Sequence, residues 1–510
     1  MKKINRKALI IALAAVLAVA IVVTVVVVVC TRSKSDETYT VTFNSNGGTA
    51  VESITGVAHN SRIAEPAAPT RLGYIFGGWY KQKELADVWR FNRDRVTADI
   101  TLYAKWNYNA TQGLQMELKA GGTYTVTGMG NVTDGVIVVP SVYEGLPVTA
   151  VAREAFAKNV NITAVILPDS IVTIDSRAFD GCTALTEAVL PNNAIMGEYV
   201  FNGCKNLVKV NLPANLTTVP RYTFYECHSL AAIEFPSGIK TIGENAFYEC
   251  RKLVNFTFPN GLERIERNAF SGCHTLTAVN IPSAVKSIGV RAFSNCVSVD
   301  TLTVAAHNLN YYSVNNCIIS DHKLIVGCKS SVIPSDGSVT VIGEGAFQGC
   351  QGLTRINSGS AVSLAGITEI QDYAFAGCSA LTSVSIPAGV TSIGEGAFSS
   401  CEFLDTVSFA KNTTLRSIGQ EAFAYCAVAS VRLPATLTRI GVGAFWGYGI
   451  RISYLGTTED WLSGKIKVCS AGEDEINDYD KSYYDGLYSV LCEANGNNAT
   501  YSVPCLAWGD

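Results

Sequence analysis

The sequence predicts a mainly β protein, in which a transmembrane helix precedes a small β module and a long solenoid of stacked coils. Three observations carry this prediction. An uncharged apolar run lies at residues 8–30 of the 510-residue chain. A Trp-rich segment without Cys follows it at 38–107. From residue 113 onward, a unit of about 23 residues that ends in A-F-x-x-C recurs through most of the chain, and such periods are typical of solenoids.

The apolar run is long enough to span a membrane. At a rise of about 1.5 Å per residue, a helix over 8–30 matches a hydrocarbon core of roughly 30 Å. Four cations precede it within the first seven residues: Lys2, Lys3, Arg6 and Lys7. The positive-inside rule therefore predicts a cytoplasmic N-terminus, a single-pass anchor in the cell membrane, and residues 31–510 outside the cell.

Two alternatives to an uncleaved anchor exist. A cleaved signal peptide has a shorter apolar core and a small-residue cleavage site, whereas this run ends in "VTVVVVVC". Lipidation of Cys30 would require a small residue where Val29 stands. We therefore interpret residues 1–34 as a basic cytoplasmic tip and a transmembrane anchor, although the sequence does not settle cleavage or lipidation.

The charge pattern argues against a nucleic-acid partner. The chain has 39 Lys and Arg against 43 Asp and Glu, a net charge of −4. No basic run occurs after the first seven residues, and phosphate backbones are bound by clustered cations.

The segment 38–107 opens with "YTVTFNSNGG", an alternating strand that ends in a Gly-Gly turn. It continues through "GYIFGGWY" and closes with "TLYAKWN". In these pieces it resembles the Listeria–Bacteroides repeat, or internalin B-repeat, which implies a β-grasp-like module of bacterial surface proteins. Its aromatic residues are most simply core residues, with an aromatic-lined sugar site as the alternative: Phe76, Trp79, Tyr80, Tyr103 and Trp106.

The repeat unit reads L-x-x-V-x-I-P-x-x-V-x-x-I-G-x-x-A-F-x-x-C, as in "LTAVNIPSAVKSIGVRAFSNC" at 276–296. V-x-I directs two side chains to one face of a short strand, and Pro ends that strand. The second V-x-x-I and the A-F turn supply apolar groups from the other sides. A single coil cannot bury them, so the coils must stack around a shared core.

This pattern resembles the BspA-like leucine-rich repeats of surface proteins in host-associated bacteria, which implies adhesion. We assign 113–450 to this solenoid with its N-terminal cap, and 451–510 to a capping segment and tail. The irregular unit at 308–334 resembles the hairpin-bearing coil of that family. In the tail, "YSVLCEANGNNATYSVPC" predicts a hairpin over Asn495-Gly496, but the role of 469–510 stays open.

Ten cysteines each follow a Phe by three residues: Cys182, Cys204, Cys227, Cys250, Cys273, Cys296, Cys350, Cys378, Cys401 and Cys426. One Cys per coil forms a line rather than a tetrahedral metal site. In-register stacking keeps Cβ atoms about 4.8 Å apart, which is too far for a disulfide, and a catalytic Cys needs a nearby base. We interpret the ten cysteines as small buried groups, each of which donates a weak S–H hydrogen bond to a carbonyl.

Besides Cys30, five cysteines stay unassigned by this pattern. Cys317 and Cys328 flank a predicted hairpin, across which they could form a disulfide. The pairing of Cys469, Cys492 and Cys505 is undetermined by the sequence.

No catalytic, cofactor-binding or metal-ligating motif occurs, so we predict a non-enzymatic protein. The outward residues of V-x-I should form two columns on one sheet face, which suits an extended ligand. The candidate ligand face comprises Lys209, Asn211, Glu234, Asn255, Thr257, Asn280, Arg355, Ser385 and Arg432. The predicted partner is a host, matrix or neighbouring-cell protein or glycan. The alternatives are a passive stalk or envelope-structure protein, and an enzyme whose site lies in the tail.

Overall fold

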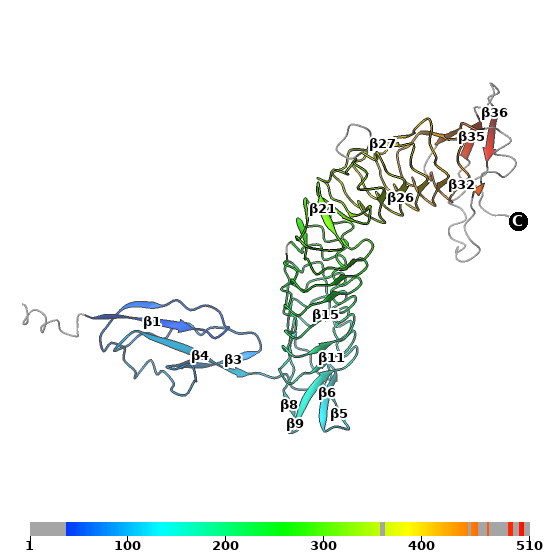
Figure 1. The fold of residues 1–510 in the computed structure, drawn as a ribbon. Coiled ribbons are helices and arrows are strands. Elements are labelled where there is room, and N and C mark those ends of the chain that lie inside the picture. The colour runs from blue at the N-terminus through cyan, green and yellow to red at the C-terminus, as the bar shows by residue number, and fades with distance from the viewer. Residues whose placement is uncertain are drawn as a thin grey trace, which may run out of the picture. The chain divides into compact units, whose positions relative to one another are not determined.

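The computed structural model describes residues 37–254, 256–356, 363–446, 450–456, 467–468, 488–492 and 499–503. The chain divides into two compact units, Met1–Ala110 and Thr111–Asp510, and each is described by itself. The regular elements of the described residues are all β-strands (Figure 1). None of these residues forms a helix that could cross a membrane, and the anchor predicted at 8–30 lies outside them.

The first unit is a four-stranded sheet of order β2-β1-β4-β3. The strands are β1 (Thr38–Asn44), β2 (Ile54–Ala58), β3 (Tyr74–Tyr80) and β4 (Ile100–Tyr108). β1 and β4 are parallel, and the two outer pairs are antiparallel. Trp79 is buried in its core with its ring 4.8 Å from that of Phe43, whereas Phe76, Tyr80, Tyr103 and Trp106 are half-buried.

The second unit begins with a small cap of strands. They are β5 (Gln115–Lys119), β6 (Thr123–Gly128), β8 (Val142–Tyr143) and β9 (Leu146–Val151). β5 pairs antiparallel with β6, and β6 pairs parallel with β9. β9 then pairs parallel with β11 (Thr173–Ile174), the second short strand of the following coil, so the cap covers the end of the core and starts the stack.

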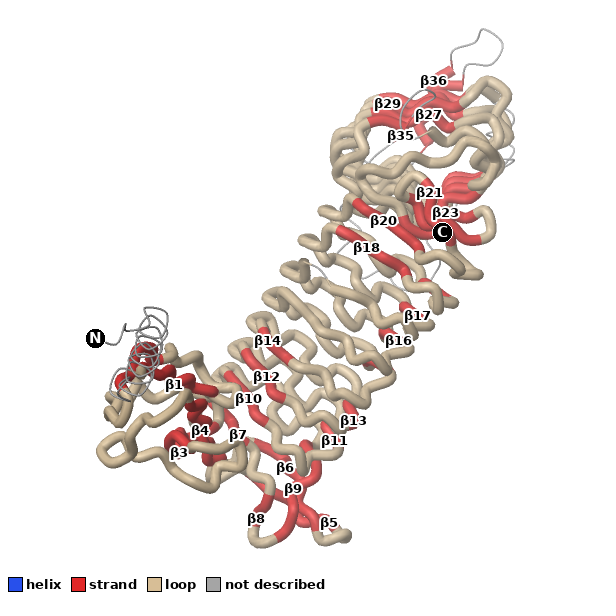
Figure 2. The backbone as a smooth tube through the Cα atoms, turned by 60° about the vertical axis from the view of Figure 1, so that its left-hand side comes forward, coloured by secondary structure: helices blue, strands red, loops and turns tan. Residues whose placement is uncertain are grey.

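Most coils contribute their V-x-I segment to a first ladder of parallel strands, side by side along the coils (Figure 2). These strands are β7 (Val136–Val138), β10 (Ala164–Ile166), β12 (Glu187–Val189), β14 (Lys209–Val210), β18 (Ala278–Ile281), β20 (Thr301–Val304), β25 (Arg355–Ile356), β27 (Ser383–Ile386), β29 (Thr406–Phe409), β31 (Ser430–Leu433), β33 (Arg451–Tyr454) and β35 (Tyr488–Cys492).

The single sheet face expected from the outward V-x-I residues is divided into four sheets. In their described residues, the two coils between β14 and β18 form no strand of this first ladder. There Phe256 and Phe258 take the inward positions that hold Val or Ile elsewhere, and Phe235 contacts both. Bulky rings in a close-packed site displace the backbone, so we attribute the break to these three residues.

The V-x-x-I segment forms a second ladder on another side of the coils. Its strands are β11 (Thr173–Ile174), β13 (Ile195–Met196), β15 (Thr218–Val219), β16 (Thr241–Ile242), β17 (Arg264–Ile265), β19 (Ser287–Ile288), β23 (Lys323–Val326), β24 (Val341–Ile342), β26 (Glu369–Ile370), β28 (Ser392–Ile393), β30 (Ser417–Ile418), β32 (Arg439–Ile440) and β34 (Lys467–Val468). The Ile or its equivalent points inward, and the residue before it is mostly outside the core.

The A-F turn closes each coil without a strand. The residue two positions before each Phe has φ between 51° and 62° in every coil from Glu154 to Gly443. This left-handed conformation reverses the chain and directs the Phe inward. The rings then stack nearly parallel in two columns, with centroids 5.1 to 5.7 Å apart: Phe156 to Phe293, and Phe347 to Phe445.

A hairpin coil separates the two columns. β21 (Tyr312–Val314) and β22 (Cys317–Ser320) pair antiparallel, and β22 pairs antiparallel with β23. Ile318 and Val326 belong to the core upstream of the hairpin, whereas Ile319 and Leu324 belong to the core downstream. The hairpin is therefore an apolar partition with both faces buried.

The tail continues the stack. β35 pairs parallel with β33 and antiparallel with β36 (Ala499–Val503), as the predicted hairpin requires. The turn residues Asn495-Gly496 lie outside the described residues.

Candidate binding face

The candidate ligand face rests on alternation within the first ladder. Val279 and Ile281 are buried on either side of exposed Asn280, and Val431 and Leu433 flank exposed Arg432 in the same way. Six candidates are exposed: Lys209, Asn211, Glu234, Thr257, Asn280 and Arg432. Ser385 is half-buried, Arg355 lies in β25, and Asn255 lies outside the described residues.

Three of these side chains already contact a neighbouring coil. The Asn211 amide donates to the Leu190 carbonyl (2.7 Å), and the Leu190 N–H donates back to Asn211 Oδ1 (2.8 Å). Lys209 Nζ lies 2.7 Å from Glu187 Oε1. Asn280 Oδ1 accepts a hydrogen bond of 2.5 Å from Thr303. Asn211, with two bonds to one backbone, therefore acts as a bridge between coils.

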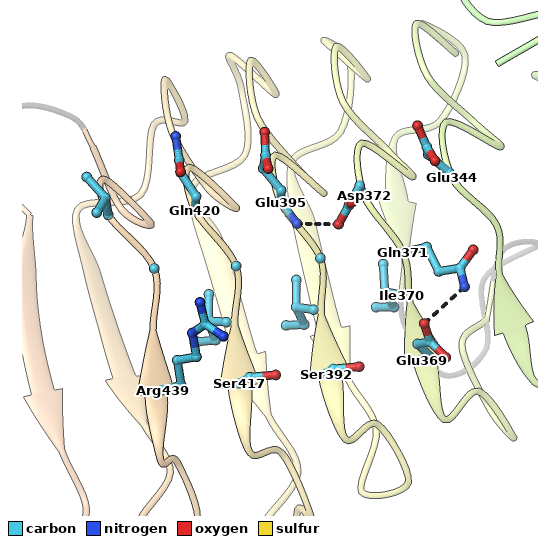
Figure 3. A pocket seen from close by; sticks show the side chains of 16 residues that line it. Glu344, Glu369, Ile370, Gln371, Asp372, Ser392, Glu395, Ser417, Gln420 and Arg439 are labelled. Carbon is cyan, nitrogen blue, oxygen red and sulfur yellow. Dashed lines mark hydrogen bonds between the residues drawn. The ribbon is translucent and has the colours of Figure 1, made fainter. Parts of the chain in front are cut away.

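A shallow groove of about 680 Å³ lies on the second ladder, not on the face that the sequence predicts. Ser392, Ser417 and Arg439 lie in one row along it (Figure 3). Glu369 belongs to the same row, because it pairs with Ser392. A second row carries Glu344, Asp372, Glu395 and Gln420. The sequence prediction was limited to the outward columns of V-x-I, so it did not include these residues. The position before the second Ile recurs with the same period and could have indicated them.

The carboxylates of this groove already have donors. Glu344 lies 2.9 Å from the Arg291 guanidinium, and Glu369 accepts a hydrogen bond of 3.0 Å from Gln371. Asp372 accepts from the Glu395 N–H at 2.8 Å. Across the described residues, no group of three or more His, Cys, Asp and Glu could hold a metal ion. The groove is therefore lined by carboxylates that already have partners within the fold.

The Tyr373 hydroxyl donates to Glu395, and this contact couples two coils beside the groove. Burial, together with this hydrogen bond, raises the pKa of Tyr373 to about 12. The phenol therefore keeps its proton, and keeps donating to Glu395, even above pH 10, where a free tyrosine would ionise.

The ten repeated cysteines lie inside the solenoid. Nine Sγ–H groups donate to the carbonyl of the Phe in the preceding coil, at 3.0 to 3.4 Å. The tenth, Cys350, donates to Gly327 at 3.8 Å. Burial raises the pKa of Cys182 and of Cys378 to about 12, so these thiols are poor nucleophiles. The weak S–H bond inferred from the sequence is thus confirmed, and its acceptor is identified.

The disulfide considered between Cys317 and Cys328 is not formed, since both residues are free thiols. Cys317 Sγ lies 3.6 Å from the Val332 carbonyl oxygen, and Cys328 Sγ lies 3.4 Å from Ser330 Oγ. Cys317 packs in the downstream core and Cys328 in the upstream core.

Stacked coils with two ladders of short strands, a shared core and one buried Cys per coil define a β-solenoid of leucine-rich repeats. The sequence matches the BspA type leucine rich repeat region over residues 149–273, 194–324 and 323–451, and the chain belongs to this family. Residues 39–105 match the Listeria–Bacteroides repeat domain.

Similar proteins agree with this assignment. A leucine rich cell surface protein from Faecalibacterium prausnitzii A2-165 is 25% identical, with a TM-score of 0.53 over 71% of this chain and 98% of that one. Internalin H of Listeria monocytogenes is 44% identical over 75 residues, and a protein named as a Gly-rich membrane protein of Evansella cellulosilytica is 45% identical over 71 residues. These two matches cover 14% of this chain and only 13% and 8% of those proteins.

Proposed function

We propose that the protein is a membrane-anchored surface protein that displays its solenoid outside the cell for adhesion, and that it binds a host, matrix or neighbouring-cell protein or glycan without catalysis. Residues 8–30 would be the anchor, and residues 31–510 would be extracellular. The Faecalibacterium protein is named as a cell surface protein, which supports this location.

The observation that carries the proposal is the outward column of the first ladder. Its polar side chains are fixed at regular intervals by the buried residues that alternate with them. Rigid side chains lose little entropy on binding, so such a column suits an extended partner. Glu234 and Thr257 are exposed in the two coils where the ladder is broken, and Val208 and Val254 expose apolar surface in neighbouring positions.

The test replaces Glu234, Asn255 and Thr257 together with alanine and measures both adhesion of cells and binding to an array of glycans and matrix proteins. Glu234 and Thr257 are exposed, and the repeat pattern predicts an outward position for Asn255. We therefore expect the fold to persist and adhesion to fall at least about tenfold, which corresponds to about 1.4 kcal/mol of binding free energy.

The matched control replaces Thr218 and Arg264, which are exposed on the second ladder of the same solenoid half. This variant should adhere normally. Equal adhesion by the first variant and the unchanged protein would refute the binding face and favour a passive stalk.

A further inference from the structure

The groove on the second ladder has a floor of glycines. A Cβ added to Gly394, Gly419 or Gly441 would lie 2.5 Å or less from a backbone nitrogen of the preceding coil. These three residues follow the second Ile in consecutive coils, and they leave the space above them without side chains. We call them the glycine floor. Upstream, the same position alternates between Gly and larger residues: Asp175, Gly197, Pro220, Gly243, Glu266 and Gly289.

Two rows of side chains border the glycine floor (Figure 3). The first row carries Glu369, Ser392, Ser417 and Arg439, and the second row carries Glu344, Asp372, Glu395 and Gln420. Successive residues of the first row are paired on neighbouring strands, which lie about 4.8 Å apart. Four of the eight side chains are carboxylates and one is a guanidinium. The groove is therefore acidic over most of its length, with the Arg at one end.

Carboxylates beside the upstream part of the second ladder are neutralised by cations. Glu198 lies 2.8 Å from Arg221, and Glu266 lies 3.4 Å from Arg264. Glu263 lies within 3.6 Å of two lysines. The upstream surface therefore carries little uncompensated negative charge.

Three carboxylates of the groove differ from these, because their partners are neutral. Glu369 accepts from the Gln371 amide, Asp372 from the Glu395 N–H, and Glu395 from the Tyr373 hydroxyl. Each donor reaches one carboxylate oxygen, and the second oxygen has no hydrogen-bond partner among the described residues. None of the three forms an ion pair there, so their negative charge is uncompensated.

The shape and the polar groups of the groove indicate which cation would fit. A cavity of about 680 Å³ that extends from Glu344 to Arg439 suits an elongated ligand better than a single ion. Ser392, Ser417 and Gln420 can both donate and accept hydrogen bonds, as a peptide main chain requires. No aromatic side chain is among the described residues that line the groove, so it lacks the ring faces against which a sugar would pack.

We propose that this groove binds an extended segment of a partner protein that carries lysine or arginine. The cationic side chains lie against Glu369, Asp372 and Glu395, and the main chain of the segment follows the glycine floor. Neutral or acidic residues of the segment lie toward Arg439, so the charges of the groove also set its direction. The groove is separate from the first-ladder face that we propose for adhesion.

The test measures binding of a short fluorescent peptide of alternating lysine and serine to the full chain in a nonionic detergent, by fluorescence polarisation. The groove variant carries Glu369→Gln, Asp372→Asn and Glu395→Gln. Amide oxygens still accept hydrogen bonds, so the contacts with Gln371 and Tyr373 should persist while the three charges are removed.

The matched control carries Glu198→Gln, Glu263→Gln and Glu266→Gln, which removes the same charge from the upstream surface. A second groove variant, Ser392→Arg, places a cation among the carboxylates. The fold should accept this change, because the same position of the second ladder holds Arg in β17 and β32.

The unchanged chain and the matched control should bind the peptide alike, and both groove variants at least about fivefold more weakly, since each exposed ion pair contributes modestly. Raising NaCl from about 50 to about 500 mM should also weaken binding at least about fivefold, and a peptide of alternating glutamate and serine should not bind.

Four outcomes would overturn the proposal. They are no binding by the unchanged chain, normal binding by the groove variants, an equal loss in the matched control, and binding of spermine, which has no carbonyl groups, as tightly as the peptide. Loss of peptide binding with normal adhesion would leave the first-ladder face intact.

Discussion

Truncation of a Phe inside the stacked column should cost more than truncation at its end. Phe247 is fully buried, stacks on Phe224 (5.3 Å) and Phe270 (5.1 Å), and meets the edge of Phe235 (5.7 Å). Removing a buried Phe side chain costs about 3–5 kcal/mol, and we expect Phe247→Ala near the upper end. Phe293 stacks on Phe270 at 5.5 Å, at the end of the upstream column.

Phe247 makes two more aromatic contacts than Phe293, and each such pair adds about 0.5–1.5 kcal/mol beyond burial, so Phe293→Ala should cost about 1–3 kcal/mol less than Phe247→Ala. The free energy of unfolding is measured by urea denaturation followed by circular dichroism, with alkylation of Cys250 as a local reporter. Phe247→Leu, which keeps much of the apolar volume, serves as the control. Equal losses for the two alanine variants would refute the view that stacking along the column stabilises the coils.

Three further predictions follow. Arg291→Ala should lower the free energy of unfolding by about 1–2 kcal/mol, because Arg291 pairs with Glu344 and lies 4.1 Å from the centre of the Tyr373 ring. Urea denaturation measures this loss, and Arg291→Lys should recover part of it. Gly327→Ala should destabilise the fold by about 1–3 kcal/mol, because the added Cβ would lie 2.1 Å from Phe347 Cε1. Accelerated alkylation of Cys350 would report this loss. Gly121→Ala, where the added Cβ would meet no atom within 4 Å, should leave Phe347 undisturbed. The thiols of Cys182 and Cys378 have a pKa of about 12 in the folded chain, whereas they lose the proton near pH 9 in the unfolded chain. The free energy of unfolding should therefore fall as the pH rises from 9 toward 12. A urea midpoint that is unchanged between these pH values would contradict this.

The structure of a single coil can be predicted from the sequence because every coil repeats the same pattern of apolar residues. The period, the inward Val and Ile of each strand, and the buried Phe and Cys all follow from apolar spacing. The acceptor of the thiols could not be predicted, because it depends on which carbonyl of the preceding coil comes nearest.

The structure differs from these predictions where residue volume or contacts between coils determine the local geometry. Phe235, Phe256 and Phe258 satisfy the apolar pattern as well as Val does, yet their size interrupts the ladder. Asn211 looks like an outward polar residue in the sequence, but its two bonds to Leu190 give it a partner within the fold. The groove near Arg439 depends on side chains from several coils, which no single repeat reveals.

The hairpin coil also bears on how such a chain can change its length over generations. A regular coil presents nearly the same surface above and below, so a duplicated or deleted coil meets neighbours that it already fits. The hairpin presents two different surfaces, because Ile318 and Val326 contact one core while Ile319 and Leu324 contact the other. Duplication or deletion of a regular coil is thus tolerable on either side of the hairpin. The hairpin itself has to occur once, between the two cores.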